Sequence, residues 1–159
     1  MRSPRTSVML AAVLVLALAM TACGDDDDSG GEAGGGGNGG TTVDVTLQEF
    51  AVGVSEASAP AGDVTFDVTN EGPDDVHEFV VIRTDLAPTD LPTDENGAVD
   101  EEGEGIEVVD EIEDIPVGET ETLTLDLDAG SYVLICNIWD EEEQEAHYSE
   151  GMRAGFTVD

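Results

Sequence analysis

Apolar and polar residues alternate with a period of two along much of the chain after residue 40. The alternation is clearest in three short runs, at 43–47, 64–68 and 123–127. A period of two puts successive side chains on opposite faces of an extended strand, so each run predicts a β-strand with one face buried and one face in water. This pattern limits the chain to folds in which a strand buries one face against another layer.

Two further runs, at 76–82 and 132–138, are more continuously apolar. Strands of that kind are expected at the centre of a sheet that is covered on both faces. Phe156 and Val158 suggest a final strand. Turn signals rich in Gly, Pro, Asn and Asp separate these runs, at 60–62, 70–73, 116–118 and 128–130.

No stretch of the chain has a convincing helical period. Residues 84–105 hold two prolines, an Asn-Gly pair and many acids, and they are predicted to be an exposed loop or insertion. Short strands with frequent turns in about 120 residues predict an all-β fold, a β-sandwich with one domain.

The N-terminus has the pattern of an export signal. Arg2 and Arg5 precede an uninterrupted apolar run, Val8 to Met20, which is too short to span a bilayer as a helix. The following residues, Met20-Thr21-Ala22-Cys23, resemble the lipobox of bacterial lipoproteins. The resemblance implies that residues 1–22 are a signal peptide and that Cys23 becomes the lipid-bearing first residue. Ordinary cleavage near Ala22, which leaves a secreted protein with a free thiol, is the alternative.

Residues 23–40 contain little besides Gly and Asp, and nothing apolar larger than Ala33 follows the cysteine. Such a segment has too little apolar surface to fold and is predicted to be a flexible tether. Residues 41–159 then form the folded domain. The lipid at Cys23 would hold the protein at the outer face or the periplasmic side of a membrane.

The composition is strongly acidic, with 38 Asp and Glu against four Arg and no Lys, for a formal net charge of −34. Nucleic-acid binding is excluded because it needs clustered basic side chains. Docking on anionic lipids through protein charge is disfavoured for the same reason. In so acidic a chain, pairs of carboxylates occur by chance, so they are no evidence of an enzyme. Most of the charged side chains are expected to lie on the solvated surface.

Four residues stand apart because their types are rare. Without residues 1–23, the chain has only two histidines, one cysteine and one methionine: His77, His147, Cys136 and Met152. His77 opens an apolar run, Cys136 lies within another, and His147 and Met152 come just before the last strand. Two imidazoles, one thiolate and a weak thioether are the ligands of a type 1 copper site.

On these residues the domain resembles the cupredoxins, the plastocyanin- and azurin-like blue copper proteins. The resemblance implies a Greek-key β-sandwich holding one copper ion. It assigns His77 as the first imidazole ligand, Cys136 as the thiolate, His147 as the second imidazole and Met152 as the axial thioether. It also places His147 near the surface, as the port through which electrons enter and leave.

The sequence departs from the family pattern between the thiolate and the second imidazole. Ten residues, 137–146, separate Cys136 from His147, where the family usually has two to four. Five of the ten are acidic. The extra residues can bulge outward and leave the ligands in place, or they can loosen the site.

The resemblance implies a one-electron carrier that converts no substrate. A monomer is expected, with a redox partner that has a basic docking surface. Copper scavenging or delivery through the same ligands remains an alternative, as does a metal-free binding module with the same fold.

Overall fold

The computed structural model describes residues 40–159, which form a β-sandwich. The predicted signal peptide, the lipidated Cys23 and the tether up to residue 39 lie outside the described residues. Within residues 40–159, no helix is long and apolar enough to cross a membrane.

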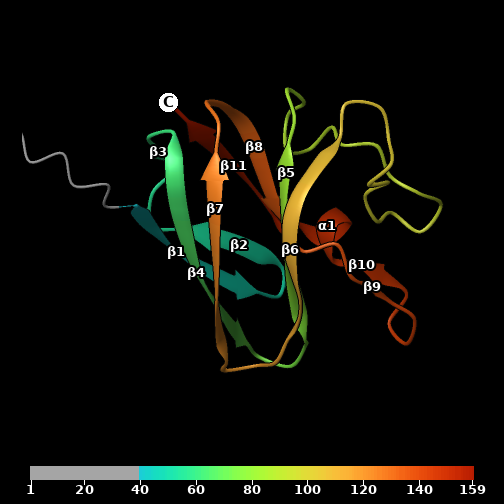
Figure 1. Cartoon of the computed structure of the whole chain (residues 1–159). Helices are drawn as coiled ribbons and strands as arrows, with labels where there is room; N and C mark the ends of the chain where they lie inside the picture. The colour runs from blue at the N-terminus through green and yellow to red at the C-terminus, as the bar shows by residue number, and fades with distance from the viewer. Residues whose placement is uncertain (1–39) are drawn as a thin grey trace, which may run out of the picture. The chain divides into compact units, whose positions relative to one another are not determined.

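The first sheet has four strands in the order β2-β1-β4-β7 (Figure 1). They are β1 (Thr41–Gln48), β2 (Ala51–Val54), β4 (Gly62–Gly72) and β7 (Thr120–Leu127). β1 runs parallel to β4, and the other pairs are antiparallel. The three clearest alternating runs of the sequence therefore lie side by side in one sheet.

The second sheet has five strands in the order β3-β11-β8-β5-β6. They are β3 (Ser58–Ala59), β5 (His77–Arg83), β6 (Glu107–Ile115), β8 (Gly130–Ile135) and β11 (Arg153–Val158). A short hairpin of β9 (Trp139–Asp140) and β10 (Glu145–Ala146) and a single helical turn, α1 (His147–Glu150), complete the domain.

The core lies between the two sheets and follows the alternation of the sequence. In β4, for example, Val64, Phe66 and Val68 are fully buried, whereas the residues between them are partly exposed. The ring of Phe66 contacts those of Phe79 from β5 and Phe156 from β11. Each fully buried side chain of this size contributes roughly 1.5–3 kcal/mol to folding. The predicted sandwich is confirmed.

A second apolar cluster covers the outer face of the five-stranded sheet. Val80 and Ile82 of β5 and Val133 and Ile135 of β8 point away from the main core and are almost fully buried. This explains why the runs at 76–82 and 132–138 lack alternation, because both of their faces are covered.

The segment that provides this cover was predicted to be an exposed loop, and that prediction is wrong in part. Leu91 and Val99, within residues 84–105, are each only 5% exposed and pack against the outer face of the sheet. The physical reason is that the central strands have a second apolar face that must be removed from water. The acids of the segment remain exposed around these two side chains.

β6 has no counterpart among the predicted strands. Five of its nine residues are Asp or Glu, and its burial pattern is mostly exposed. It lies at the edge of the second sheet and pairs only with β5. Charged side chains suit an edge strand because they oppose pairing with another chain.

Candidate metal centre

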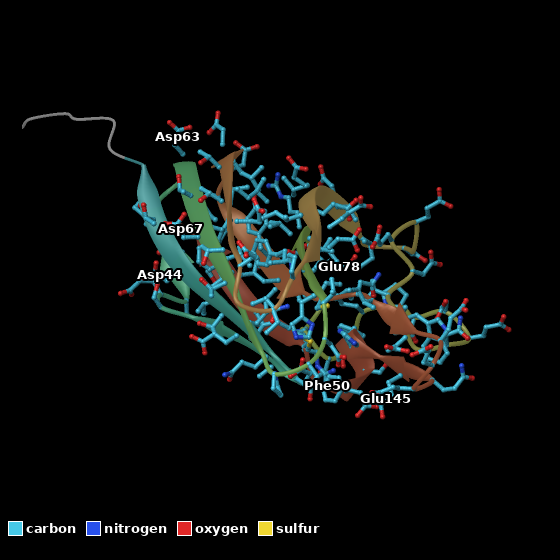
Figure 2. The ribbon with its side chains drawn as sticks, turned by 90° about the horizontal axis from the view of Figure 1, so that it is seen from below. Asp44, Phe50, Asp63, Asp67, Glu78 and Glu145 are labelled. Atoms are coloured by element: carbon cyan, nitrogen blue, oxygen red, sulfur yellow. The ribbon has the colours of Figure 1, made fainter. Side chains whose placement is uncertain are left out.

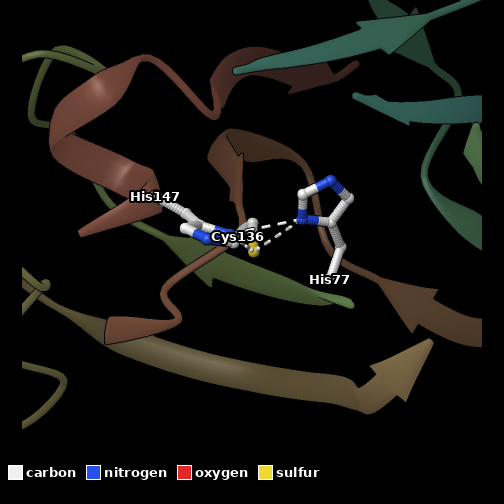
Figure 3. Close-up of side chains that lie close together, drawn as sticks. All are labelled: His77, Cys136 and His147. Atoms are coloured by element: carbon white, nitrogen blue, oxygen red, sulfur yellow. Dashed lines mark hydrogen bonds between the residues drawn. The ribbon is translucent and has the colours of Figure 1, made fainter. Parts of the chain in front are cut away.

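The structure brings three of the four predicted ligands together at one end of the sandwich. One nitrogen of each histidine and the sulfur of Cys136 all lie within 4.8 Å of one another (Figure 3). The sulfur is 3.8 Å from Nδ1 of His77 and 3.3 Å from Nδ1 of His147, and the two nitrogens are 3.2 Å apart. All three residues are buried, with exposures of 0% for His77 and Cys136 and 2% for His147.

The three residues come from three separate segments. His77 is the first residue of β5, Cys136 directly follows β8, and His147 opens α1 directly after β10. β5 and β8 are antiparallel neighbours, with Val80 opposite Ile135. The start of one strand therefore lies beside the end of the other, which brings His77 next to Cys136.

A fully buried Asn70 fixes the turn that leads into β5. Its side-chain nitrogen donates to the carbonyls of Asp75 and Ile115, at 2.8 and 2.9 Å, and its side-chain oxygen accepts from the Gly72 N–H at 2.8 Å. Ile115 is in turn the partner of His77 in the pairing of β5 with β6. Asn70 thus holds both chain segments that flank the first histidine.

The long segment between Cys136 and His147 forms a projecting hairpin. Trp139 pairs with Ala146 and Asp140 with Glu145, so the ten residues between the two ligands fold back on themselves. At the base of the hairpin, the His147 N–H donates to the carbonyl of Ile138 at 2.9 Å. Of the two outcomes open at the sequence level, the structure shows the outward bulge, and the donor atoms stay together.

Met152 lies next to the cluster, just before β11. Its side chain is fully buried, and its carbonyl accepts a hydrogen bond of 3.1 Å from the Cys136 N–H. Its own N–H donates to the carbonyl of His147 at 3.0 Å. The backbone therefore ties Met152 to both neighbouring ligands, while its role as an axial ligand stays a prediction.

His147 is more buried than the family resemblance implies. It was expected near the surface, but its exposure is 2%. The ring of Phe50 contacts it edge-on, with ring centroids 5.6 Å apart. Any electron that reaches His147 must cross the side chains that cover it.

The sulfur of Cys136 accepts a hydrogen bond of 3.4 Å from the backbone N–H of Glu78. The carboxylate of Glu78 accepts from the backbone N–H of Asn137 at 2.9 Å. Burial, more than the neighbouring acids, raises the pKa of Glu78 to about 7. These two bonds connect Glu78, the residue after His77, to Cys136 and to Asn137. They hold the first histidine and the cysteine at a fixed distance from each other.

The segment 84–105 supports the site from the outside. The side-chain amide of Asn137 bonds to both backbone groups of Val99, at 2.6 and 3.1 Å. The Tyr148 hydroxyl in α1 donates to the carbonyl of Pro88 at 2.8 Å and accepts from the N–H of Leu91 at 3.2 Å. Sequence reasoning missed Glu78 and Asn137, since neither belongs to a rare residue type here.

The separations of the donor atoms fit a shared metal ion. Three atoms about 2.0–2.3 Å from one ion, the usual lengths of imidazole and thiolate bonds to zinc, lie about 3.5–4 Å apart when they surround it in a plane. The observed separations of 3.2, 3.3 and 3.8 Å are close to this triangle. None of the three donor atoms needs a large movement to share an ion with the other two.

The donors are also neutral before a metal binds, in keeping with their burial. Burial raises the pKa of the Cys136 thiol to about 12. Burial lowers the pKa of His77, with a further lowering from His147, and burial likewise lowers the pKa of His147. A metal ion therefore meets two uncharged imidazoles and a protonated thiol.

Several solved structures have the same architecture. Auracyanin from Roseiflexus castenholzii is 21% identical, with a TM-score of 0.51 over 75% of this chain and 97% of its own. Rusticyanin from Thiobacillus ferrooxidans is 18% identical, with a TM-score of 0.51 over 76% of this chain and 79% of its own.

Auracyanin A from Chloroflexus aurantiacus, described as a "blue" copper protein, is 18% identical, with a TM-score of 0.50 over 76% of this chain and 100% of its own. No protein-family model and no curated protein sequence matches the chain. The three proteins are cupredoxins, and the resemblance inferred from the sequence is confirmed for the fold.

We expect metal binding to release about one proton per ion at about pH 8.5, because a thiol must lose its proton to become a ligand. At this pH both histidines are already neutral, and Glu78, with a pKa of about 7, is already ionised. Only Cys136 has a proton to lose. Calorimetric titration with Cu(II) in buffers of different ionisation enthalpy measures the number released.

The control for the proton count is Cys136→Ser, whose hydroxyl keeps its proton and should reduce the release to near zero. A wild-type chain that binds the ion without releasing a proton would show that the sulfur is not a ligand.

Proposed function

We propose that this chain, which has the cupredoxin fold, holds one type 1 copper ion and carries single electrons. The observation that carries the proposal is the cluster of His77, Cys136 and His147, which are all buried and whose donor atoms lie 3.2–3.8 Å apart. Two imidazole nitrogens and one thiolate sulfur in a trigonal set favour copper.

Met152 is proposed as the weak fourth ligand. Met152 is fully buried in the same apolar core as Cys136, and its backbone bonds to Cys136 and His147. A long, weak axial thioether distinguishes a type 1 copper site from the tetrahedral sites of zinc, which use Cys, His or carboxylate ligands.

Copper in such a site supplies one-electron chemistry, since it passes between Cu(I) and Cu(II). The chain contributes a rigid donor set. Cys136 is tied to Met152 through its backbone, His147 is tied to Ile138, and His77 begins a central strand. Little rearrangement is then needed when an electron arrives or leaves, so transfer is fast.

The burial of the site favours electron transfer over copper delivery. Delivery requires ligands of an acceptor to reach the copper ion, but the three donor residues around it are at most 2% exposed. An electron needs no such access. Fast self-exchange of electrons would support the carrier function, and transfer of the ion to a metal-free acceptor would support delivery.

We also propose that the chain is exported and anchored by a lipid on Cys23. The support is the sequence pattern of a charged start, a short apolar run and small residues before the cysteine. The Gly- and Asp-rich residues 24–40 then serve as a tether that lets the domain, as a monomer, reach a partner.

The partner is proposed to be a redox protein with a basic docking surface. Asp140, Glu141, Glu142, Glu143 and Glu145 belong to the hairpin between the thiolate and His147. Glu141 to Glu143 are exposed, and Asp140 and Glu145 are partly exposed. Glu145 is one of the residues labelled in Figure 2. A local excess of one charge sign attracts the opposite sign and suppresses wrong partners.

Adding Cu(II) to the purified full chain should produce the intense visible absorption of a thiolate-to-copper transition. Cys136→Ala should abolish it, because the sulfur is then gone. Cys23→Ala is the matched control: it removes the other cysteine of the chain and should leave the colour unchanged. A colourless wild-type protein would overturn the proposed function.

Neutralising the five hairpin acids, with Asn for Asp140 and Gln for the four glutamates, should raise the reduction potential. Negative charge near the ion favours Cu(II), so its removal favours Cu(I). The shift should shrink as salt is added, because exposed charges are screened. Redox titration of the copper-loaded protein measures it.

A control with five acids neutralised elsewhere separates a local effect from the overall charge. The positions are Asp44, Glu56, Asp63, Asp126 and Asp159, which are all exposed. Asp44 and Asp63 lie on the part of the sandwich away from Glu145 (Figure 2). A potential that does not rise for the hairpin variant, or rises equally for both, would contradict a local effect.

The rate of electron exchange with a small basic haem protein should fall as ionic strength rises, since attraction between opposite charges speeds their encounter. An acidic electron carrier of similar size should show the opposite dependence. Stopped-flow measurements over a salt series provide the test. A rate with the basic protein that does not change with salt would argue against a basic partner.

A further inference from the structure

The ring of His77 has a second nitrogen, Nε2, which points away from the cluster toward an acidic side chain. Oε1 of Glu49 lies 3.6 Å from this nitrogen. The His77 side chain is fully buried and that of Glu49 is only 12% exposed. We propose that Glu49 is the positioning residue of the metal centre, which holds a proton on Nε2 and thereby turns the free electron pair of Nδ1 toward the site.

The Glu49 carboxylate is itself held in place by the backbone. Its Oε1 accepts hydrogen bonds from the N–H groups of Asp75, at 2.7 Å, and Asp74, at 3.2 Å. Both donors belong to the turn that leads into His77, and the buried Asn70 bonds to the carbonyl of Asp75. Glu49, which directly follows β1, therefore links the first sheet to the strand start that carries His77.

The two side chains leave complementary atoms without partners. Among residues 40–159, the buried side-chain nitrogen and oxygen atoms that lack a hydrogen bond are Nε2 of His77 and Oε2 of Glu49. A buried polar atom without a partner is costly. Nε2 lies 3.6 Å from the other oxygen of the same carboxylate, Oε1, which is slightly longer than a hydrogen bond. A small rotation of either side chain would bring a carboxylate oxygen within hydrogen-bond distance of Nε2.

That pairing is possible with only one arrangement of the imidazole proton. An ionised carboxylate only accepts hydrogen bonds, so Nε2 must carry the hydrogen. The backbone N–H groups of Asp75 and Asp74 both donate to the Glu49 carboxylate, and hydrogen bonds of this kind favour its ionised form. The carboxylate is thus ionised and ready to accept.

The tautomer matters because the cluster itself does not select one. Nδ1 of His77 faces Nδ1 of His147 at 3.2 Å and the sulfur of Cys136 at 3.8 Å. Either nitrogen could be the donor in that contact. With Nε2 protonated by virtue of Glu49, Nδ1 of His77 is left as an acceptor, which is the form that binds a metal.

The effect of Glu49 on copper rests on the proposed function, because it requires His77 to be a copper ligand. A carboxylate that accepts from a ligand imidazole makes the other nitrogen a stronger donor. A stronger donor stabilises Cu(II) more than Cu(I). Glu49 should therefore increase copper affinity and lower the reduction potential.

The test variant is Glu49→Gln. The amide oxygen of Gln can still accept from the Asp74 and Asp75 N–H groups, so the turn keeps its anchor, but its NH₂ group cannot accept from Nε2–H. The matched control is Glu71→Gln. Glu71 is exposed and accepts a hydrogen bond from Gln48 at 3.1 Å. Its substitution removes the same charge from the same end of the first sheet, because Gln48, next to Glu49, lies opposite Gly72 in the pairing of β1 with β4.

The first readout needs no metal. Imidazole nitrogen chemical shifts of the metal-free full chain distinguish the two neutral tautomers of His77. The wild type and Glu71→Gln should show a proton on Nε2, and Glu49→Gln should show a mixture or the other tautomer. A wild-type His77 with its proton on Nδ1 would overturn the inference, even if the variant did not fold.

The second readout uses the ion. Glu49→Gln should lower Cu(II) affinity by about 10–100-fold and raise the reduction potential more than Glu71→Gln does. Equal effects of the two variants would show that only charge matters and would overturn a positioning role. If the wild type binds no copper, the proposed function fails, while the tautomer measurement still decides the role of Glu49.

Discussion

One backbone hydrogen bond, from the N–H of Cys136 to the carbonyl of Met152, closes the segment that supplies three of the four candidate ligands. It continues the antiparallel pairing of β8 with β11, where Ile135 lies opposite Arg153. Because the two strands are already joined at this point, the chain between them, residues 137–151, must leave the sheet and return to it. The projecting hairpin and α1 are what the chain forms in that interval.

The second constraint on the site is the end of β5. His77 reaches the cluster because β5 lies next to β8 in the sheet, and its starting residue is set by the turn that Asn70 fixes. The same turn binds the carboxylate of Glu49. The geometry of the site is thus determined by backbone groups and buried amides more than by the ligands themselves.

The fold and three members of the cluster were predictable because their signals are strong. Period-two alternation marks half-buried strands such as β4, and rare residue types such as His and Cys are easy to notice in an acidic chain. The burial of Leu91 and Val99 was not predictable, because two apolar residues in an acidic segment carry no periodic signal. Glu49 was not predictable either, since it is one of 38 acids and its role depends on a partner in another strand.

The β9–β10 hairpin separates the docking surface of the chain from the positions of its metal ligands. Its ladder pairs Trp139 with Ala146 and Asp140 with Glu145, outside the cluster, and its base is fixed by the bond from His147 to Ile138. Residues 141–144 at its tip can therefore be lengthened, shortened or recharged without moving a ligand. Such a chain can acquire a new docking partner while the positions of its metal ligands stay the same, and the hairpin tip is a suitable place to graft a recognition sequence.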